Sequence, residues 1–181
     1  KIFTSGIMLY VSGVGYDPTG EIQHNGEPVE RNHAVNALLH AAVLASDEAV
    51  ELSSNGDRPS RIKGDPTEAA LIVAAAKVGL HKPTLDERYP RIHEIPFTSE
   101  SKRMTTIHES ENGSIAYAKG APEVILSSCT QHLMINGVEP LEEPEREEIL
   151  ATAQSMADQA LRVLAIARKP DTDTQQAEQS M

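Results

Sequence analysis

The sequence predicts an α+β domain in which a mainly antiparallel, twisted sheet is flanked by helices. β-like runs and amphipathic helical stripes are interleaved, without the regular strand-helix-strand alternation of a parallel sheet. Short turn signals join successive β-like runs, as in hairpins. A doubly wound parallel sheet is the alternative class.

The first part of the chain predicts a hairpin followed by a helix. Met8–Val14 is strand-like, residues 15–20 form a turn rich in glycine and proline, and a short strand returns through Ile22. Asn32 is a suitable N-cap for a helix whose apolar residues recur with helical period. These are Val35, Leu38, Leu39, Ala42 and Val43.

A polar segment then separates this helix from a more apolar one. Ser53–Lys63 is rich in charge and in residues that break secondary structure, so it predicts a loop. The next helix is predicted from Pro66 to about Val78, and Gly79 ends it. Because this helix is apolar around most of its circumference, we expect it to be buried.

Three β-like runs predict the antiparallel sheet. They are Arg91–Phe97, Met104–His108 and Ile115–Lys119, and residues 110–113 form a hairpin-type turn between the last two. A short helix is expected over Pro122–Ser128. It is followed by a small strand at residues 133–135 that ends in an Asn-Gly turn.

The last part predicts a helix, a strand and a tail. Pro144 opens the helix, whose stripe is Ile149, Ala153, Met156, Ala157 and Ala160. Leu161–Ala167 has the continuous apolar character of a central strand. We expect residues 1–169 to form one domain and residues 170–181 to be a linker.

Composition excludes several classes of protein. The longest apolar stretch, Ala69–Ala76, is far shorter than the ~20 residues that a membrane-spanning helix needs. A net charge of -11 argues against nucleic-acid binding, which depends on clustered Lys and Arg. The seven histidines are scattered and Cys129 is the one cysteine, so no metal site is expected.

The chain begins at Lys1 and shows no signal-peptide pattern, which suggests an internal segment of a longer protein. A single cysteine cannot form an intramolecular disulfide, so a reducing, cytoplasmic setting is expected. A monomer is the simplest expectation for such a segment.

Glu68 and Thr67 stand at the start of a predicted helix. One interpretation is local: Asp65 is the N-cap, Pro66 the first helical residue and Glu68 the capping-box partner. The functional interpretation is that the Glu68 carboxylate accepts a hydrogen bond from an exocyclic amino group such as that of adenine. Thr67 beside it could contribute a hydroxyl.

Phe97 lies where a strand breaks into a polar run that contains Lys102. A phenylalanine at a strand end is commonly a core residue. An aromatic face beside cations is also what a nucleotide requires, because a base stacks on the ring while the cations meet phosphate. Met104 could pack against the base or fill the core.

Lys119 and Arg162 are cations on apolar strand-like runs. Lys119 either extends to solvent or lines a binding site. Gly120 and Ala121 lead into the next helix, whose free N–H groups favour an anion. Arg162 needs a partner, either a carboxylate such as Glu68 or a phosphate.

Four segments resemble the nucleotide-binding (N) domain of type II P-type ATPases. They are KGDPTEAAL (63–71), PFTSESKRMT (96–105), AYAKGAPEVIL (116–126) and ALRVLAIAR (160–168), in the same order and with similar spacing. Residues 10–22 resemble the entry segment of the calcium-pump branch. Two departures are Ser99, where animal reticulum calcium pumps usually carry arginine, and residues 43–47, which lack a cysteine-asparagine pair.

The resemblance implies roles for individual residues in ATP binding. Phe97 would stack on adenine, Glu68 would hold its amino group, and Arg162 would reach the phosphates. Lys119 and Gly120 would line the floor of the site. The further lining residues would be Thr67, Lys102, Met104, Ala121 and Leu164.

The resemblance also implies what other parts of a pump supply. The phosphorylated Asp-Lys-Thr-Gly-Thr motif and the magnesium-binding aspartates of the phosphorylation domain do not occur in this sequence. The chain would therefore bind ATP without turnover, as a cytoplasmic domain of an integral membrane protein. Its partners would be the phosphorylation, actuator and transmembrane domains, with Mg-ATP used by the intact pump.

Two rival functions fit the sequence less well, and the expected transported ion has alternatives. A self-sufficient phosphotransferase needs a phosphate loop, and no GxxxxGK[ST] run is present. A protein-interaction module without nucleotide affinity is disfavoured because Phe97, Glu68, Lys119 and Arg162 occur together. Calcium is the expected ion, with sodium and protons as alternatives.

Overall fold

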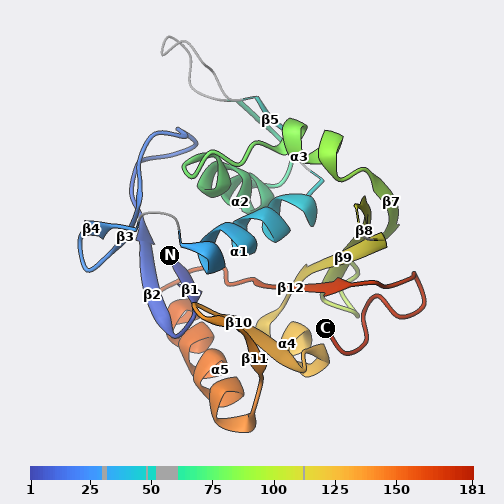
Figure 1. Ribbon diagram of the computed structural model, residues 1–181. Coiled ribbons are helices and arrows are strands. Elements are labelled where there is room, and N and C mark those ends of the chain that lie inside the picture. Colours follow the sequence, from blue (N-terminus) through green and yellow to red (C-terminus); the bar gives the residue numbers. More distant parts are fainter. Residues whose placement is uncertain (30–31, 48, 52–60, 112) are drawn as a thin grey trace. The chain divides into compact units, whose positions relative to one another are not determined.

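The chain folds into two compact units. The computed structural model describes residues 1–29, 32–47, 49–51, 61–111 and 113–181. Lys1–Leu85 form the first unit and Asp86–Met181 the second. Helices are mixed with sheets whose described strand pairs are all antiparallel, which confirms the predicted α+β class (Figure 1).

A small antiparallel sheet opens the first unit. Its strands, in spatial order, are β1 (Ile2–Thr4), β2 (Ile7–Val11), β3 (Ile22–His24) and β4 (Glu27–Pro28). The predicted hairpin is confirmed, because β2 pairs with β3 and Tyr10 lies opposite Gln23. β2 ends at Val11 rather than at the predicted Val14. Gly13 has a φ of 98°, a backbone conformation that a regular strand cannot contain.

The helix α1 (His33–Leu44) begins and packs as the sequence predicts. The Asn32 side chain accepts hydrogen bonds from the backbone N–H groups of Ala34 (2.9 Å) and Val35 (3.2 Å). Most of the predicted apolar stripe is buried, and Leu38 is half-buried.

The helix α2 (Pro66–Ala76) has the predicted start but is less buried than expected. The Asp65 carboxylate caps it by accepting a hydrogen bond from the Thr67 N–H (2.6 Å). Ala69, Ile72, Val73 and Ala75 are buried, but Ala70 is exposed and Leu71 half-buried, so the expected burial holds for one face of the helix only. One face of α2 packs against α1, and the short alanine side chains leave the other face partly open.

Short elements near the middle of the chain differ from the predicted loop. The strand β5 (Ala49–Glu51) pairs with β6 (Arg61–Lys63), so the loop prediction is wrong for residues 61–63. Residues 53–60 of that prediction lie outside the described residues. The helix α3 (Lys82–Arg88) was not predicted, although its Lys-Pro start is a helix signal.

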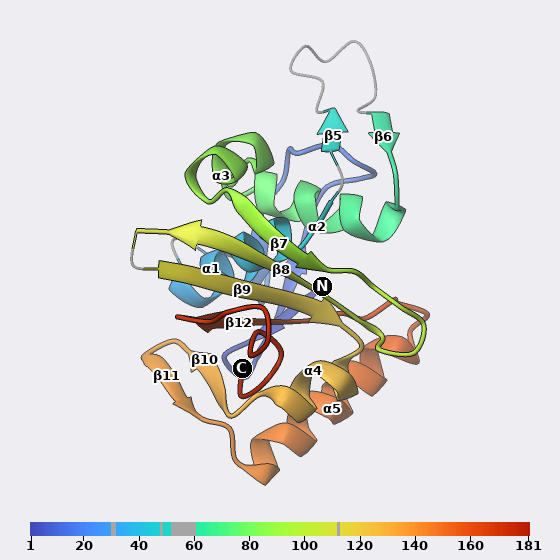
Figure 2. The same ribbon diagram turned by 90° about the vertical axis from the view of Figure 1, so that its right-hand side faces the viewer.

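The second unit is built on a four-stranded antiparallel sheet. Its strands are β7 (Arg91–Ile95), β8 (Arg103–Ser110), β9 (Gly113–Gly120) and β12 (Ala165–Pro170), in the order β12-β9-β8-β7 (Figure 2). The predicted hairpin is confirmed, with Ser110 opposite Gly113.

The last strand differs from its prediction in two ways. β12 begins at Ala165 rather than Leu161, and it is an edge strand rather than a central one. Leu161–Leu164 is apolar chain that runs toward the sheet without pairing, and Ala160 before it has a φ of 59°. The strand starts where the backbone reaches Gly120 of β9.

Helices and a hairpin complete the second unit. The helix α4 (Pro122–Ser128) has the predicted bounds, and β10 (Gln131–Met134) pairs with β11 (Gly137–Pro140) across the Asn-Gly turn. The helix α5 (Glu143–Ala157) starts one residue before Pro144. Its apolar stripe is only half-buried or exposed, because α5 contacts the rest of the unit mainly through the short α4.

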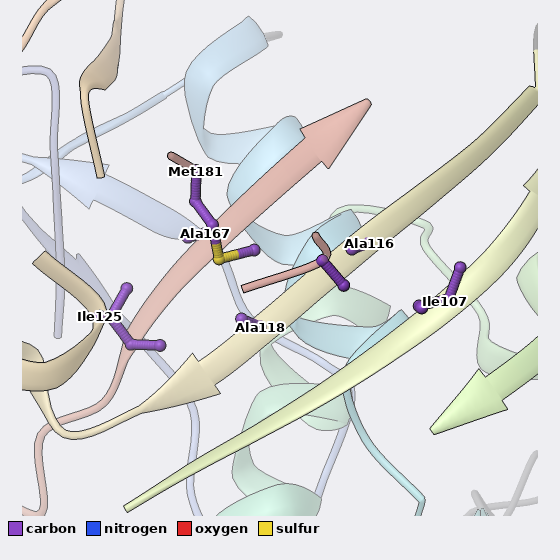
Figure 3. Close-up of a cluster of buried hydrophobic side chains, with 7 residues drawn as sticks. Ile107, Ala116, Ala118, Ile125, Ala167 and Met181 are labelled. Carbon is purple, nitrogen blue, oxygen red and sulfur yellow. The ribbon is translucent and has the colours of Figure 1, made fainter. Parts of the chain in front are cut away.

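The core of the second unit lies on one face of its sheet. Strand residues Ile107, Ala116, Ala118 and Ala167 meet Ile125 of α4 there. Ala177 and Met181, from the end of the chain, belong to the same cluster (Figure 3). Small alanines on neighbouring strands let the helix and the terminal segment approach the sheet closely.

Residues 171–181, which we call the C-terminal strap, were expected as linker. In the structure the strap lies against the core, with Ala177 fully buried and Met181 7% exposed. Its backbone is tied to the end of α4, because the Met181 N–H donates to Ser128 O and the Thr130 N–H donates to Met181 O, both at 2.7 Å. A domain boundary at residue 169 and a linker role toward a further domain stay predictions.

None of the helices in the described ranges is long and apolar enough to cross a bilayer.

Tyr117, on β9, makes the stability of the fold sensitive to alkaline pH. Burial raises the pKa of its phenol to about 12, with a smaller contribution from Tyr89. The unfolded chain ionises near pH 10 while the folded chain keeps the proton, so stability falls as pH rises through this interval. We expect the loss contributed by Tyr117 to approach about 1.4 kcal/mol per pH unit between the two pKa values.

Urea unfolding at pH 9, 10 and 11 measures this slope. In Tyr117→Phe the alkaline decline should be shallower than in the wild type. Tyr10→Phe is the control, because Tyr10 is 51% exposed. Equal slopes for Tyr117→Phe and wild type would contradict the prediction.

Candidate functional site

Most of the predicted site residues of the second unit gather at one end of its sheet. At this end β8 begins, β9 ends and β12 begins, because Arg103 and Ala165 both lie opposite Gly120. The end of β7 lies at the same place, since Ile95 is opposite Thr105. Residues distant in sequence are thereby brought together by strand register alone.

Phe97 follows the end of β7 and is 59% exposed, so the interpretation as a core residue is wrong. A closed turn comes directly after it. The Lys102 N–H donates to Thr98 O (2.8 Å), and the Ser101 N–H donates to the Thr98 hydroxyl oxygen (3.0 Å). The turn is held by its own hydrogen bonds, and an aromatic face stands in solvent beside it.

Lys102 ends this turn in an unusual backbone conformation, with a φ of 48°. The Ala121 N–H donates to the Lys102 carbonyl oxygen (3.0 Å), which joins the turn to the start of α4. The Lys102 Nζ lies 3.6 Å from Oε1 of Glu123, and both side chains are more than half exposed. Such a pair is weak, so the ammonium group is available to an incoming anion.

Gly120 allows the close approach of β8 and β9 at this point. A Cβ on Gly120 would lie 2.9 Å from the Arg103 Cα and closer still to the Lys102 carbonyl oxygen. Both neighbours are backbone atoms, which cannot move aside without disturbing the strand. The residue must therefore be glycine for the turn and the strands to keep this geometry.

Met104 and Lys119 are direct partners across β8 and β9 and so lie on the same face of the sheet. Met104 is 4% and Lys119 7% exposed. A lysine this buried does not extend into solvent, so that interpretation is wrong, and its role in lining a site stays a prediction. Ile166 of β12 is opposite Lys119 and shares this face.

Arg162 and Leu164 precede β12 instead of lying on it. The expectation that Arg162 lies on a strand is therefore wrong. Leu164 adjoins Ala165, which is opposite Gly120, so it lies at the same end of the sheet. Arg162 is exposed and lies two residues before Leu164.

Thr67 and Glu68 belong to the first unit, in the first turn of α2. Oε2 of Glu68 accepts a hydrogen bond from the backbone N–H of Asp47 (2.8 Å), just beyond the end of α1. The carboxylate is thus fixed between the two helices of its unit. A shared site with Phe97 and Lys119 stays a prediction.

Two residues of this region were not singled out from the sequence. Ser101 closes the turn after Phe97, and a Thr-x-x-Ser pattern after a strand is a recognisable signal for it. Glu123 pairs with Lys102, and an acidic residue in the first turn of a helix could have indicated a partner for a nearby cation.

Comparison with known proteins identifies the family. The model of the family described as "P-type ATPase, cytoplasmic domain N" matches residues 34–181, a range that contains every predicted site residue. The chain belongs to this P-type ATPase family. The family predicted from the four sequence segments is thereby confirmed, and the match extends over residues 34–181.

Individual relatives of this N domain are cation pumps. The chain is 36% identical over 176 residues to the cation-transporting ATPase pma1 of Synechocystis, which covers 93% of this chain and 19% of the relative. It is 37% identical over 136 residues to calcium-transporting ATPase 1 of Lactococcus lactis, a match that covers 75% of this chain and 15% of the relative. It is 33% identical over 177 residues to calcium-transporting ATPase type 2C member 1 of Bos taurus, a match that covers 94% of this chain and 18% of the relative. The chain therefore spans less than a fifth of these relatives.

Proposed function

We propose that this N domain binds ATP at the end of the β12-β9-β8-β7 sheet and positions it for phosphoryl transfer to an aspartate in a separate domain of a cation pump. The observation that carries the proposal is the exposed Phe97 ring beside the hydrogen-bonded turn that ends in Lys102. A base can stack on the ring while the ammonium group meets a phosphate. An aromatic ring and a nearby ammonium group therefore suit the base and the phosphates of a nucleotide.

The other residues at this end of the sheet fit the same ligand. Met104 and Lys119 share one face of the sheet, so a thioether and a cation stand side by side. Gly120 and Ala121 supply backbone without bulky side chains. We place Leu164 and Arg162 next to them, with Arg162 directed to the phosphates. The role of Thr67 and Glu68, which belong to the first unit, toward the adenine amino group rests on the family resemblance alone.

In the whole pump, the domain would act by positioning. Holding the γ-phosphate in line with the acceptor carboxylate converts a bimolecular encounter into an intramolecular step. Magnesium would be held with the phosphates by aspartates of the phosphorylation domain, where it neutralises developing charge. The domain's place would be the cytoplasmic side of a membrane protein, beside the phosphorylation, actuator and transmembrane domains.

Calcium is the transported ion that the relatives' names favour, since two of the relatives above are calcium-transporting ATPases. The test is ion-stimulated ATPase activity of the full-length pump. Activation by calcium supports the assignment. Activation by sodium alone, or full activity without any added cation, would refute it.

Calorimetric titration of the 181-residue chain with ATP tests the binding function. We expect binding without Mg²⁺, because contacts with the base should dominate, and no sustained phosphate release. Lys119→Met should weaken binding about tenfold, as expected for the loss of one charge-assisted contact. Arg168→Met is the matched control, since it removes one positive charge from an exposed position on β12.

The outcomes that contradict the function are distinct. Strict dependence on Mg²⁺ would show that the base contacts do not dominate. A phosphate-releasing activity that copurifies with the chain would show that the chain hydrolyses ATP without a further domain. Equal weakening by Lys119→Met and Arg168→Met would mean that only net charge matters.

A further inference from the structure

The C-terminal strap is joined to β8 by an ion pair that the ATP-binding proposal does not use. Oε2 of Glu178 lies 2.5 Å from Nη2 of Arg103, and both side chains are largely buried, at 23% and 16% exposure. Oε1 of the same carboxylate accepts a hydrogen bond from the Thr105 hydroxyl (2.6 Å). One strap residue therefore holds two successive inward positions of β8.

Arg103 also reaches the end of α4. Its Nη1 donates to the Ser128 hydroxyl (3.3 Å), next to the Ser128 carbonyl that accepts from Met181. Arg103 thus connects the strap, the end of α4 and the first residue of β8. Because the guanidinium is largely buried, the Glu178 carboxylate compensates much of its desolvation.

Arg103 sits between two residues of the proposed ATP site. Lys102 and Met104 flank it in sequence, and Gly120 lies opposite it. Side chains alternate along a strand, so Arg103 and Thr105 point to the strap side while Met104 and Lys119 point to the other face. The strap therefore packs on the face of the sheet opposite to Met104 and Lys119, where it does not compete with a ligand.

We propose that Glu178 and Arg103 are positioning residues for ATP: the strap fixes the start of β8 and thereby the placement of Lys102 and of the turn after Phe97. This inference rests on the proposed ATP-binding function. Loss of the Glu178 charge leaves a buried guanidinium without its counter-charge, and the first residue of β8 shifts to reach water. The Ala121 N–H bond to Lys102 O then loosens, and Lys102 loses its fixed position.

ATP affinity of the Glu178→Gln variant of the full chain is the test. We expect Kd to rise about three- to tenfold, the range of coupling that packed second-layer contacts carry. Ile107→Val is the matched control, because it thins the same core beneath the strap without touching the ion pair. It should lower Tm and leave Kd unchanged.

A structural role alone is separated from positioning by a double-variant measurement. In the Glu178→Gln background, Lys102→Met should weaken ATP binding less than it does in the wild type, because Lys102 is already misplaced.

Hydrogen exchange of the Ala121 amide, measured without ATP, should be faster in Glu178→Gln. The Arg103→Met/Glu178→Met double variant should bind ATP more tightly than Glu178→Met alone, since no buried charge is left unpaired.

The outcomes separate this inference from the proposed function. If wild type binds ATP and Glu178→Gln binds it equally well, the positioning role is overturned and the binding function stands. Strictly additive effects of Lys102→Met and Glu178→Gln, or unchanged Ala121 exchange, would also overturn it. If the wild type itself binds no ATP, the proposed function fails and this inference fails with it.

Discussion

Phe97→Ala is expected to weaken ATP binding roughly 5- to 150-fold, the equivalent of about 1–3 kcal/mol for one base stacked on an aromatic ring. The ring is 59% exposed, so its loss removes little buried area. The free energy of unfolding should therefore change by less than about 0.5 kcal/mol. Calorimetry with ATP and urea unfolding measure the two effects separately.

The chain offers a matched control for this prediction. Ile92, on β7, is 58% exposed and lies on the same strand that leads to Phe97. Ile92→Ala should leave ATP affinity unchanged. A comparable loss of affinity in both variants would place the effect in strand β7 rather than in stacking. Unchanged affinity in Phe97→Ala would remove the central element of the proposed site.

Gly120→Ala is expected to cost about 1–3 kcal/mol of stability, as overpacking at a tight contact does. The added Cβ would lie 2.9 Å from the Arg103 Cα, and Gly120 has a strand partner on both sides, Arg103 of β8 and Ala165 of β12. Relief requires β8 and β9 to separate where Lys102 and Ala121 are hydrogen-bonded. ATP affinity should therefore fall together with stability.

Urea unfolding and ATP calorimetry on the same samples check this prediction. Gly6→Ala is the comparison, because Gly6 has a φ of 71° and no atom within 4 Å of the added Cβ. Its cost is expected to be near 1 kcal/mol and to come from backbone conformation alone, with ATP affinity retained. If Gly120→Ala were as stable as the wild type, the close approach of the strands would not be a constraint.

Local signals in the sequence predicted much of this fold. Asn32 and Asp65 cap the helices that they were expected to cap, because capping depends on one side chain and two or three nearby N–H groups. The hairpin between β8 and β9 follows from its turn residues in the same way. The family itself was identifiable from four short segments.

Features that depend on distant partners were not predictable in this way. The apolar run after Ala160 contains both unpaired chain and strand, and only pairing with Gly120 decides where β12 starts. The exposure of Phe97 depends on β7 ending at Ile95, which the hydrophobic pattern does not mark. Glu178 gave no signal at all, since its partners are far away in sequence.

The distance along the chain between Arg103 and Glu178, 75 residues, also has a consequence for biosynthesis. A ribosome adding about 5–20 residues per second needs several seconds to pass from one to the other. During that interval β8 and β9 can pair, but the buried guanidinium has no carboxylate and the core lacks Met181. The nascent domain should therefore acquire its final nucleotide site only after residues 171–181 have left the exit tunnel.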